Sequence, residues 1–218
     1  MSWDWRYAWE IVPALLTGLR TTLVATSLGF ALALVVGLGW ALLRRSGPPL
    51  LRLPATALAL FVRGTPLLVQ LFFLFYVLPG YGLTLSALAT GVLGLGLHFG
   101  AYLSEVFRAG IESVPRAQWE AAGALSYTRR RTWTAVVLPQ TVRHVLPGLG
   151  NYLISMFKDS ALLSIITVTE LVFAARSAAG QTFRYLEPVT MTGAIFFLVS
   201  YPTSLGVRAL QSRLDLAS

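Results

Sequence analysis

The sequence predicts an all-α integral membrane protein with about five transmembrane helices. Apolar residues make up 56% of the 218 residues and charged residues only 12%, and the mean hydropathy is +0.68. Several long stretches carry no charge, which is the pattern of helices that cross a hydrocarbon core of about 30 Å. Arginines gather in some of the intervening loops and are scarce in others, as expected for loops on two sides of a membrane. We therefore treat residues 1–218 as a single transmembrane domain.

Five apolar spans are expected, separated by basic residues or by proline and glycine. The first span ends at Arg44 and Arg45, and the prolines that follow break the helix. The third span has a face of small residues, which suits close packing against another helix: Gly91, Gly94, Gly96 and Gly100. The expected spans cover residues 18–43, 54–78, 85–112, 140–172 and 188–210, with a polar loop at 113–139.

The basic residues predict the orientation. Most of the 17 arginines and lysines follow the first, third or fifth expected span. Because cytoplasmic loops are enriched in basic residues, this distribution favours an N-terminus outside and a C-terminus inside. Aromatic and acidic residues occupy the start of the chain, where a signal peptide would be basic, so we expect the chain to insert through its own helices.

The composition also excludes several functions. The absence of cysteine excludes disulfides and thiolate chemistry, and no metal site is expected. The net charge of +8 comes from residues scattered between apolar stretches, so we expect no nucleic-acid partner. No Gly-x-x-x-x-Gly-Lys-Ser/Thr run is present, so any ATP is hydrolysed by another subunit. Five spans are few for an aqueous path, which favours two copies, or one copy and a homologue, around a two-fold axis.

The loop at 113–139 is the most distinctive stretch. It contains a short predicted helix from Gln118 to Leu125, which is too short to cross a bilayer and so lies outside it. The run Glu120-Ala121-Ala122-Gly123, with Ser126 and Leu138-Pro139 further on, resembles the EAA loop of permeases of ATP-binding-cassette (ABC) importers. Serine stands at 126 where glycine is usual, at a turn that favours positive φ and that serine adopts at some cost.

This resemblance covers about residues 17–208 and implies a type I importer permease in a bacterial cytoplasmic (inner) membrane. It implies that Glu120, Ala121, Ala122, Gly123 and Ser126 couple the chain to an ATPase. The implied partners are a second permease, two cytoplasmic subunits that bind ATP and Mg²⁺, and an external solute-binding protein. The chain itself would hold no cofactor and catalyse no reaction, and lipid would surround its spans.

Three groups of charged or polar residues are candidate sites. Lys158 and Asp159 interrupt the fourth span, and they either mark a helix end or line the translocation path. We favour the path, because one cation and one anion match a zwitterionic solute and ionisable groups within a bilayer usually face a cavity. Arg63 and Gln70 belong to the run Arg-Gly-Thr-Pro-Leu-Leu-Val-Gln, which resembles the polar amino-acid branch of these permeases. Arg63 either lines the path or marks a boundary before a kink at the proline.

The other charged residues are expected to be structural. Glu105, Arg108 and Glu112 share one helical face, so we expect Arg108 to form salt bridges with both acids. His98 is predicted to be a hydrogen-bonded packing residue. An alternative, an intramembrane hydrolase using His98 and Ser104, is disfavoured because residues six apart point about 240° around a helix axis. A structural membrane anchor would leave the basic loop without a role.

The solute is predicted from two further runs. Residues 151–164 and 184–188 resemble those of permeases for ectoine and hydroxyectoine, which are zwitterionic compatible solutes. The alternative solute is a polar or basic amino acid such as arginine, glutamine or glutamate.

Overall fold

The computed structural model describes residues 2–215, and every regular element in that range is helical. Helix α1 (Trp5–Ser46) begins well before the expected start at residue 18, because the Asp4 side chain accepts hydrogen bonds from the backbone N–H groups of Arg6 and Tyr7 and so caps it. The helix ends with Arg44 and Arg45 in its last turn, where cations are favoured by the helix dipole. At 1.5 Å per residue, α1 is about 63 Å long.

The second expected span is a bent pair of helices. Helix α2 (Pro49–Gly64) stops before Pro66, and α3 (Leu67–Phe72) continues at an angle through a π-helical turn (Phe73–Val77) and a 3₁₀ turn (Leu78–Tyr81). The two halves meet at 106°. Proline lacks the N–H that would continue the α2 hydrogen-bond ladder, which accounts for the position of the break.

The remaining elements follow in the expected order. Helix α4 (Ala87–Glu112) is continuous, and a short helix α5 (Arg116–Ala124) follows it outside the apolar spans. Helix α6 (Arg129–Thr132), a π-helical turn (Trp133–Val137), α7 (Leu138–Asp159) and a 3₁₀ turn (Ser160–Ile166) run on without interruption. A bend of 48° leads into α8 (Leu171–Thr182), and α9 (Leu186–Asp215) closes the chain. Among residues 2–215, three helices are long and apolar enough to cross a membrane, and the total is up to five if each bent pair counts as one span.

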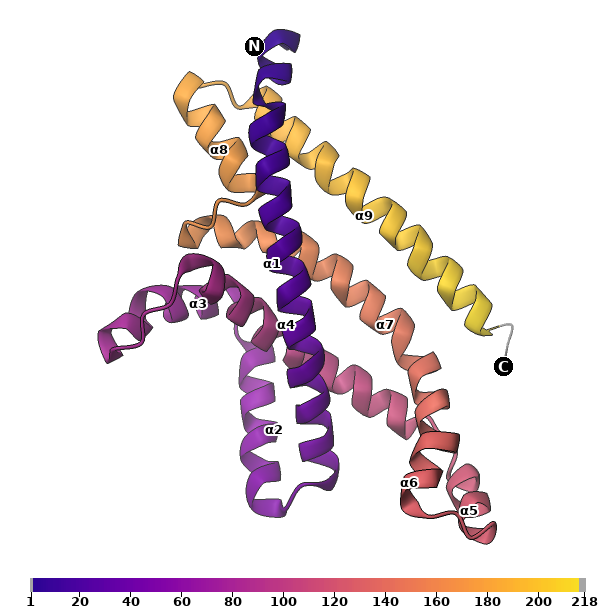
Figure 1. The fold of residues 1–218 in the computed structure, drawn as a ribbon. Coiled ribbons are helices and arrows are strands. Elements are labelled where there is room, and N and C mark those ends of the chain that lie inside the picture. The colour runs from indigo at the N-terminus through magenta and orange to yellow at the C-terminus, as the bar shows by residue number, and fades with distance from the viewer. Residues whose placement is uncertain (1, 216–218) are drawn as a thin grey trace.

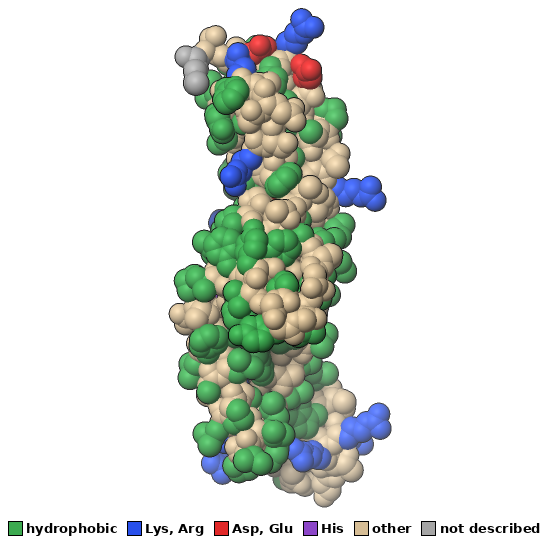
Figure 2. All heavy atoms as spheres, turned by 90° about the vertical axis from the view of Figure 1, so that its left-hand side faces the viewer, with side chains coloured by type: hydrophobic (Ala, Val, Ile, Leu, Met, Phe, Trp, Pro, Cys, Tyr) green, Lys and Arg blue, Asp and Glu red, His purple; other side chains and the backbone are tan. Residues whose placement is uncertain are grey.

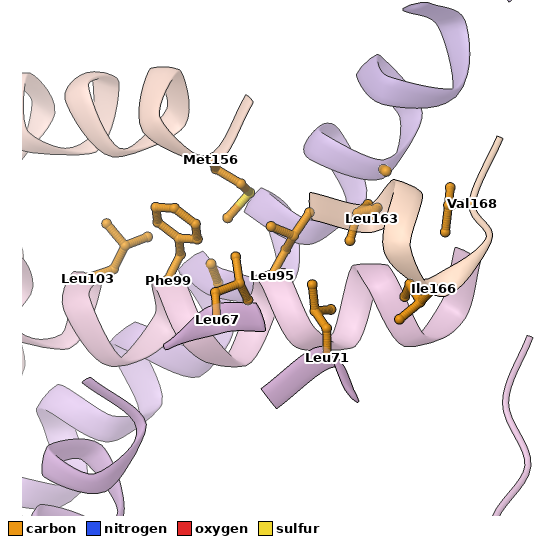
Figure 3. Packing of buried hydrophobic residues seen from close by; sticks show 11 residues of the cluster. Leu67, Leu71, Leu95, Phe99, Leu103, Met156, Leu163, Ile166 and Val168 are labelled. Atoms are coloured by element: carbon orange, nitrogen blue, oxygen red, sulfur yellow. The ribbon is translucent and has the colours of Figure 1, made fainter. Parts of the chain in front are cut away.

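Helix α4 lies at the centre and packs most closely against α1. A Cβ atom on Gly96 would lie 2.5 Å from a Leu32 methyl group, and one on Gly100 would lie 2.9 Å from Val36. These two glycines allow close approach of α4 and α1. The predicted single face is wrong for the other two, because Gly91 packs against Leu163 and Gly94 against Leu71 on a different side of α4. Figure 3 shows the adjoining core, in which Leu95 and Phe99 of α4 meet Met156 of α7 and Leu71 of α3.

The molecule has two distinct ends. Figure 1 shows the α1–α2 turn, α5 and α6 at one end, and the N-terminus, α8 and the start of α9 at the other. On the face in Figure 2, hydrophobic side chains cover the middle and charged side chains lie mostly toward the ends. Such a surface is suited to hydrocarbon in the middle and water at both ends.

Candidate functional site

Helix α5 projects from the end of the molecule as a short, solvent-exposed element (Figure 1). Ala122 is its only buried residue. The Glu120 carboxylate is exposed and pairs with the Arg116 guanidinium one turn earlier, at 3.1 Å. An exposed ion pair of this kind contributes only about 0.3–0.5 kcal/mol, so it does not fix Glu120 in place for the fold. The helix therefore presents a polar face that is free to meet another molecule.

The end of α5 explains why Ser126 matters. The backbone N–H of Ser126 donates to Gly123 O at 2.9 Å, and that of Tyr127 donates to Ala122 O at 3.0 Å. These two bonds make a Schellman motif, in which the residue after the cap is left-handed. Ser126 has a φ of 55°. The positive φ expected at this position, where glycine would be usual, is confirmed.

Lys158 and Asp159 lie at the C-terminal end of α7 and are both exposed. Within residues 2–215, neither side chain forms a hydrogen bond or an ion pair. The end of α7 lies near the middle of α1 along its length (Figure 1). Two opposite charges are thus exposed at the mid-height of an otherwise apolar molecule, where only a polar partner or a water-filled path can satisfy them.

Gln70 sits where α2 breaks and satisfies the freed carbonyl groups. Its Nε2 donates to Val62 O at 2.7 Å and to Thr65 O at 3.1 Å. The Tyr102 hydroxyl of α4 donates to the Arg63 carbonyl at 3.2 Å. Because unpaired carbonyl groups are costly at membrane depth, these side chains make the break possible.

His98 completes this arrangement. Its Nδ1 lies 3.2 Å from Gln70 Oε1, and its ring packs against Tyr102 with centroids 5.2 Å apart. The prediction that His98 is a hydrogen-bonded packing residue is confirmed. Ser104, the other half of the hydrolase alternative, donates instead to Ala101 O at 2.7 Å. The two side chains are not brought together as a catalytic pair.

Glu105 is the hub of an ion-pair cluster that joins three helices. The predicted salt bridges of Arg108 with Glu105 (2.8 Å) and Glu112 (2.7 Å) are present. The Glu105 carboxylate also forms ion pairs with Arg44 of α1 at 2.8 Å and with Arg63 of α2 at 3.1 Å. These two contacts were not predicted, because nothing in the sequence indicates which distant arginines meet an acid. The Arg63 guanidinium thus points to Glu105. This contact fits the alternative in which Arg63 marks a boundary before the kink.

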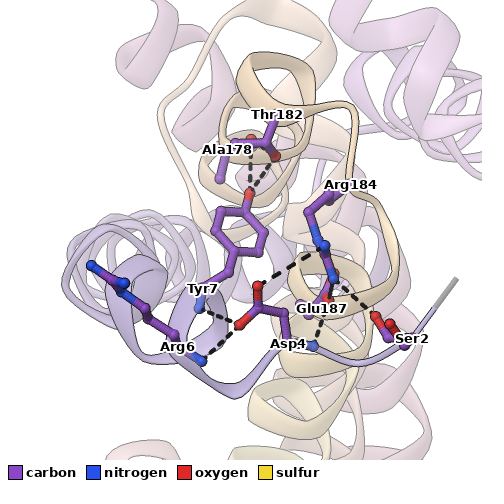
Figure 4. Close-up of polar contacts among 8 residues, drawn as sticks. All are labelled: Ser2, Asp4, Arg6, Tyr7, Ala178, Thr182, Arg184 and Glu187. Atoms are coloured by element: carbon purple, nitrogen blue, oxygen red, sulfur yellow. Dashed lines mark hydrogen bonds and ion pairs between the residues drawn. The ribbon is translucent and has the colours of Figure 1, made fainter.

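A second polar cluster ties the opposite end together (Figure 4). The backbone N–H of Asp4 donates to Glu187 at 3.0 Å, and Glu187 also pairs with Arg184. Arg184 in turn donates to Ser2 O at 2.9 Å, and the Tyr7 hydroxyl donates to Ala178 O at 2.9 Å. In the sequence, Arg184 and Glu187 belong to a run that indicates the solute. That run does not predict their contacts with residues near the N-terminus.

Comparison with known proteins identifies what the chain is similar to. A family model described as "Binding-protein-dependent transport system inner membrane component" matches residues 33–216. A probable amino-acid ABC transporter permease of Sinorhizobium fredii is 46% identical over 95% of this chain and 90% of its own length. The glutamine transport system permease of Escherichia coli (strain K12) is 31% identical over 99% of this chain and 100% of its own.

A solved structure has the same fold. The crystal structure of an amino acid ABC transporter with histidines superposes with a TM-score of 0.91 at 34% identity, covering 98% of this chain and 100% of that one. The superposition thus covers nearly the whole of both chains.

Proposed function

Because the chain belongs to the family of inner-membrane components of binding-protein-dependent transport systems, we propose that α5 couples it to an ATPase and that Lys158 and Asp159 line its solute path. The chain is a permease subunit of an amino-acid ABC importer with the type I permease fold. It is a transport subunit and not an enzyme, and nucleotide is bound by a separate ATPase subunit. It works in the inner membrane with a second permease, ATPase subunits and a solute-binding protein.

The coupling role rests on one observation: α5 is an exposed helix outside the apolar spans, and the Arg116–Glu120 pair is the only ion pair on it among residues 2–215. ATP-driven closure of the ATPase subunits would draw the α5 segments of two permeases together. Such closure changes the path only if ATP binding favours one permease state over the other. We place residues 113–139 on the cytoplasmic side, as the arginine distribution favours.

Replacing Glu120 tests this role. We expect Glu120→Lys to abolish solute-stimulated ATP hydrolysis by the reconstituted transporter while the permease still inserts and reaches normal abundance. The matched control is Arg116→Gln, which breaks the same ion pair from its other side. If the two variants are equally impaired, the ion pair and not the Glu120 surface is what matters, and the assignment of Glu120 is wrong.

The path role of Lys158 and Asp159 follows from their exposure without partners at mid-height. A second permease around a two-fold axis would enclose them, and a zwitterion carries the complementary charges. We also propose that Gln70 and Arg63 contribute to this path. They would do so by supporting the α2–α3 break, which shapes this part of the path. This second permease is either an identical copy or a homologue.

The solute is proposed to be a polar amino acid or an amino-acid-like zwitterion. The narrower candidate is ectoine or hydroxyectoine, because residues 151–164 and 184–188 resemble those of ectoine permeases. Similarity to a glutamine permease favours the broader one, with arginine, glutamine and glutamate as candidates.

The first experiment is the ATPase activity of the reconstituted transporter with its binding protein, comparing ectoine with arginine, glutamine and glutamate. Stimulation by an amino acid supports the broader proposal and rejects ectoine, and stimulation by ectoine alone does the reverse. With the active solute, Lys158→Gln and Asp159→Asn should each raise the uptake KM about tenfold, the effect of losing one charge-assisted hydrogen bond. Arg176→Gln on α8 is the matched control and should leave the KM unchanged; equal effects would contradict the path assignment.

A further inference from the structure

A basic hollow lies beside α5, and its two arginines have no part in the roles proposed above. It has a volume of about 570 Å³ and lies where the end of α1 meets α5, α6 and the π-helical turn. Two guanidinium groups supply all of its charge. Its lining residues are Arg45, Trp119, Gly123, Arg129, Thr132 and Trp133.

Arg45 is held in position by two indole rings. Its guanidinium carbon lies 5.6 Å from the Trp119 ring centroid and 6.0 Å from that of Trp133. The two indoles pack edge to face with centroids 5.5 Å apart. Cation–π contacts of this kind hold a guanidinium without using its N–H groups, which stay available for an anion.

The hollow contains no carboxylate to neutralise these arginines. The acids in this part of the chain, Glu112 and Glu120, are paired with Arg108 and Arg116. Among residues 2–215, no ion pair involves Arg45 or Arg129. Two arginines that converge without an acid form a site for an anion, and the planar fork of arginine matches phosphate in particular.

An exposed apolar stripe leads along α1 to the hollow. Val35, Leu38 and Leu42 are 71%, 43% and 42% exposed, and with Arg45 their spacing places them on one face of the helix. The uncharged part of α1 ends at Leu43, before Arg44 and Arg45, so the hollow lies where hydrocarbon gives way to water. Tryptophan is also enriched at this depth.

We propose that the hollow binds the phosphate headgroup of an anionic phospholipid, whose acyl chain lies along the α1 stripe. The stripe suits an apolar chain and the hollow suits an anion. A phospholipid carries both in one molecule, so a single lipid can occupy the stripe and the hollow together. Basic pockets beside transmembrane helices on the cytoplasmic side are suited to such headgroups. A phosphate held by Arg45 and Arg129 joins α1 to α6. The bound lipid therefore attaches the segment that contains α5 to α1.

The test is a titration of phosphatidylglycerol into the purified whole transporter, with bound lipid counted by native mass spectrometry. Arg45→Gln and Arg129→Gln should each weaken binding about tenfold, as expected for the loss of one charge-assisted contact. Arg130→Gln removes the same charge outside the hollow and should change binding less than about twofold, so an equal loss there would overturn the proposal. Phosphatidylcholine should bind no more tightly to the wild type than to the variants.

A second variant leaves the charge unchanged. A Cβ atom on Gly123 would meet no atom within 4 Å, so Gly123→Leu can fill the hollow without a clash. We expect it to weaken phosphatidylglycerol binding as the arginine variants do. If both arginine variants keep the lipid but lose the ATPase subunits, a carboxylate of that subunit is the occupant and the proposal fails. Competition by inorganic phosphate as effective as that of the lipid would equally overturn it.

Discussion

At the scale of single residues, Ser126 occupies a left-handed backbone position that favours glycine. The left-handed conformation costs an L-residue about 1–2 kcal/mol relative to glycine, yet the Schellman bonds at the end of α5 require it. The Ser126 side chain is itself exposed, so its own packing does not compensate for this cost. The C-terminal turn of α5 is therefore less stable than it would be with glycine.

Ser126→Gly should stabilise that turn. We expect the amide hydrogens of Ser126 and Tyr127, which donate to Gly123 O and Ala122 O, to exchange about fivefold more slowly, corresponding to about 1 kcal/mol. Hydrogen exchange resolved along the backbone would measure this. Ala124→Gly is the control, because glycine within a helix is unfavourable and should speed exchange. Faster exchange in Ser126→Gly would show that the serine side chain itself supports the turn.

Residue contacts were predictable from the sequence where they are local. Arg108 meets Glu105 and Glu112 because residues three and four apart share a helical face, and the sequence shows that spacing directly. The positive φ of Ser126 followed from a turn pattern of the same local kind. The approach of Arg44 and Arg63 to Glu105 was not predictable, because it depends on how α1, α2 and α4 pack against one another.

At the scale of elements, the α2–α3 break shows how a helix can end within an apolar region. Pro66 prevents the α2 ladder from continuing, and the carbonyl groups that lose their partners are satisfied by Gln70, Tyr102 and the Thr65 hydroxyl. The sequence identified the proline as a kink. It did not give the 106° angle, which is set by how α3 packs against α4.

Gln70→Leu should destabilise the α2–α3 break, and the cause should be lost hydrogen bonds and not lost packing. It removes the shorter of two side-chain hydrogen bonds to the Val62 carbonyl and the Gln70 hydrogen bond to the Thr65 carbonyl, and a buried group left unsatisfied costs about 1–3 kcal/mol. The thermal midpoint of the purified transporter should fall, whereas Gln181→Leu on the exposed face of α8 should leave it unchanged. An unchanged midpoint for Gln70→Leu would mean that the proline alone holds the break.

At the scale of the whole molecule, one polar cluster closes each end of an apolar bundle. Glu105 joins α1, α2 and α4 at the end that carries α5, and Glu187 joins α1 to the α8–α9 turn at the other. The sequence predicted the number of apolar spans and their order from their lengths and charges. It could not predict these clusters, since each joins residues far apart in the chain.

A double-mutant cycle would measure how strongly Glu105 holds its end. We expect a coupling energy of about 1–3 kcal/mol between Glu105 and Arg44, because both are largely shielded from water. The half-exposed Arg108–Glu112 pair should give about 0.3–0.5 kcal/mol. Glu105→Gln, Arg44→Gln and their combination, compared by denaturant unfolding, supply the cycle. Equal coupling in the two pairs would contradict a special role for Glu105.

The contact between Asp4 and Glu187 has a consequence for biosynthesis. These residues are 183 positions apart, so the first helix to leave the ribosome cannot complete the contacts of its N-terminal end until almost the whole chain has been made. Its contacts with α4 can form much earlier, once residue 112 has emerged. Assembly would thus proceed from the middle of α1 toward its beginning, and a chain that stops short of α9 would enter quality control with its first turn still unattached.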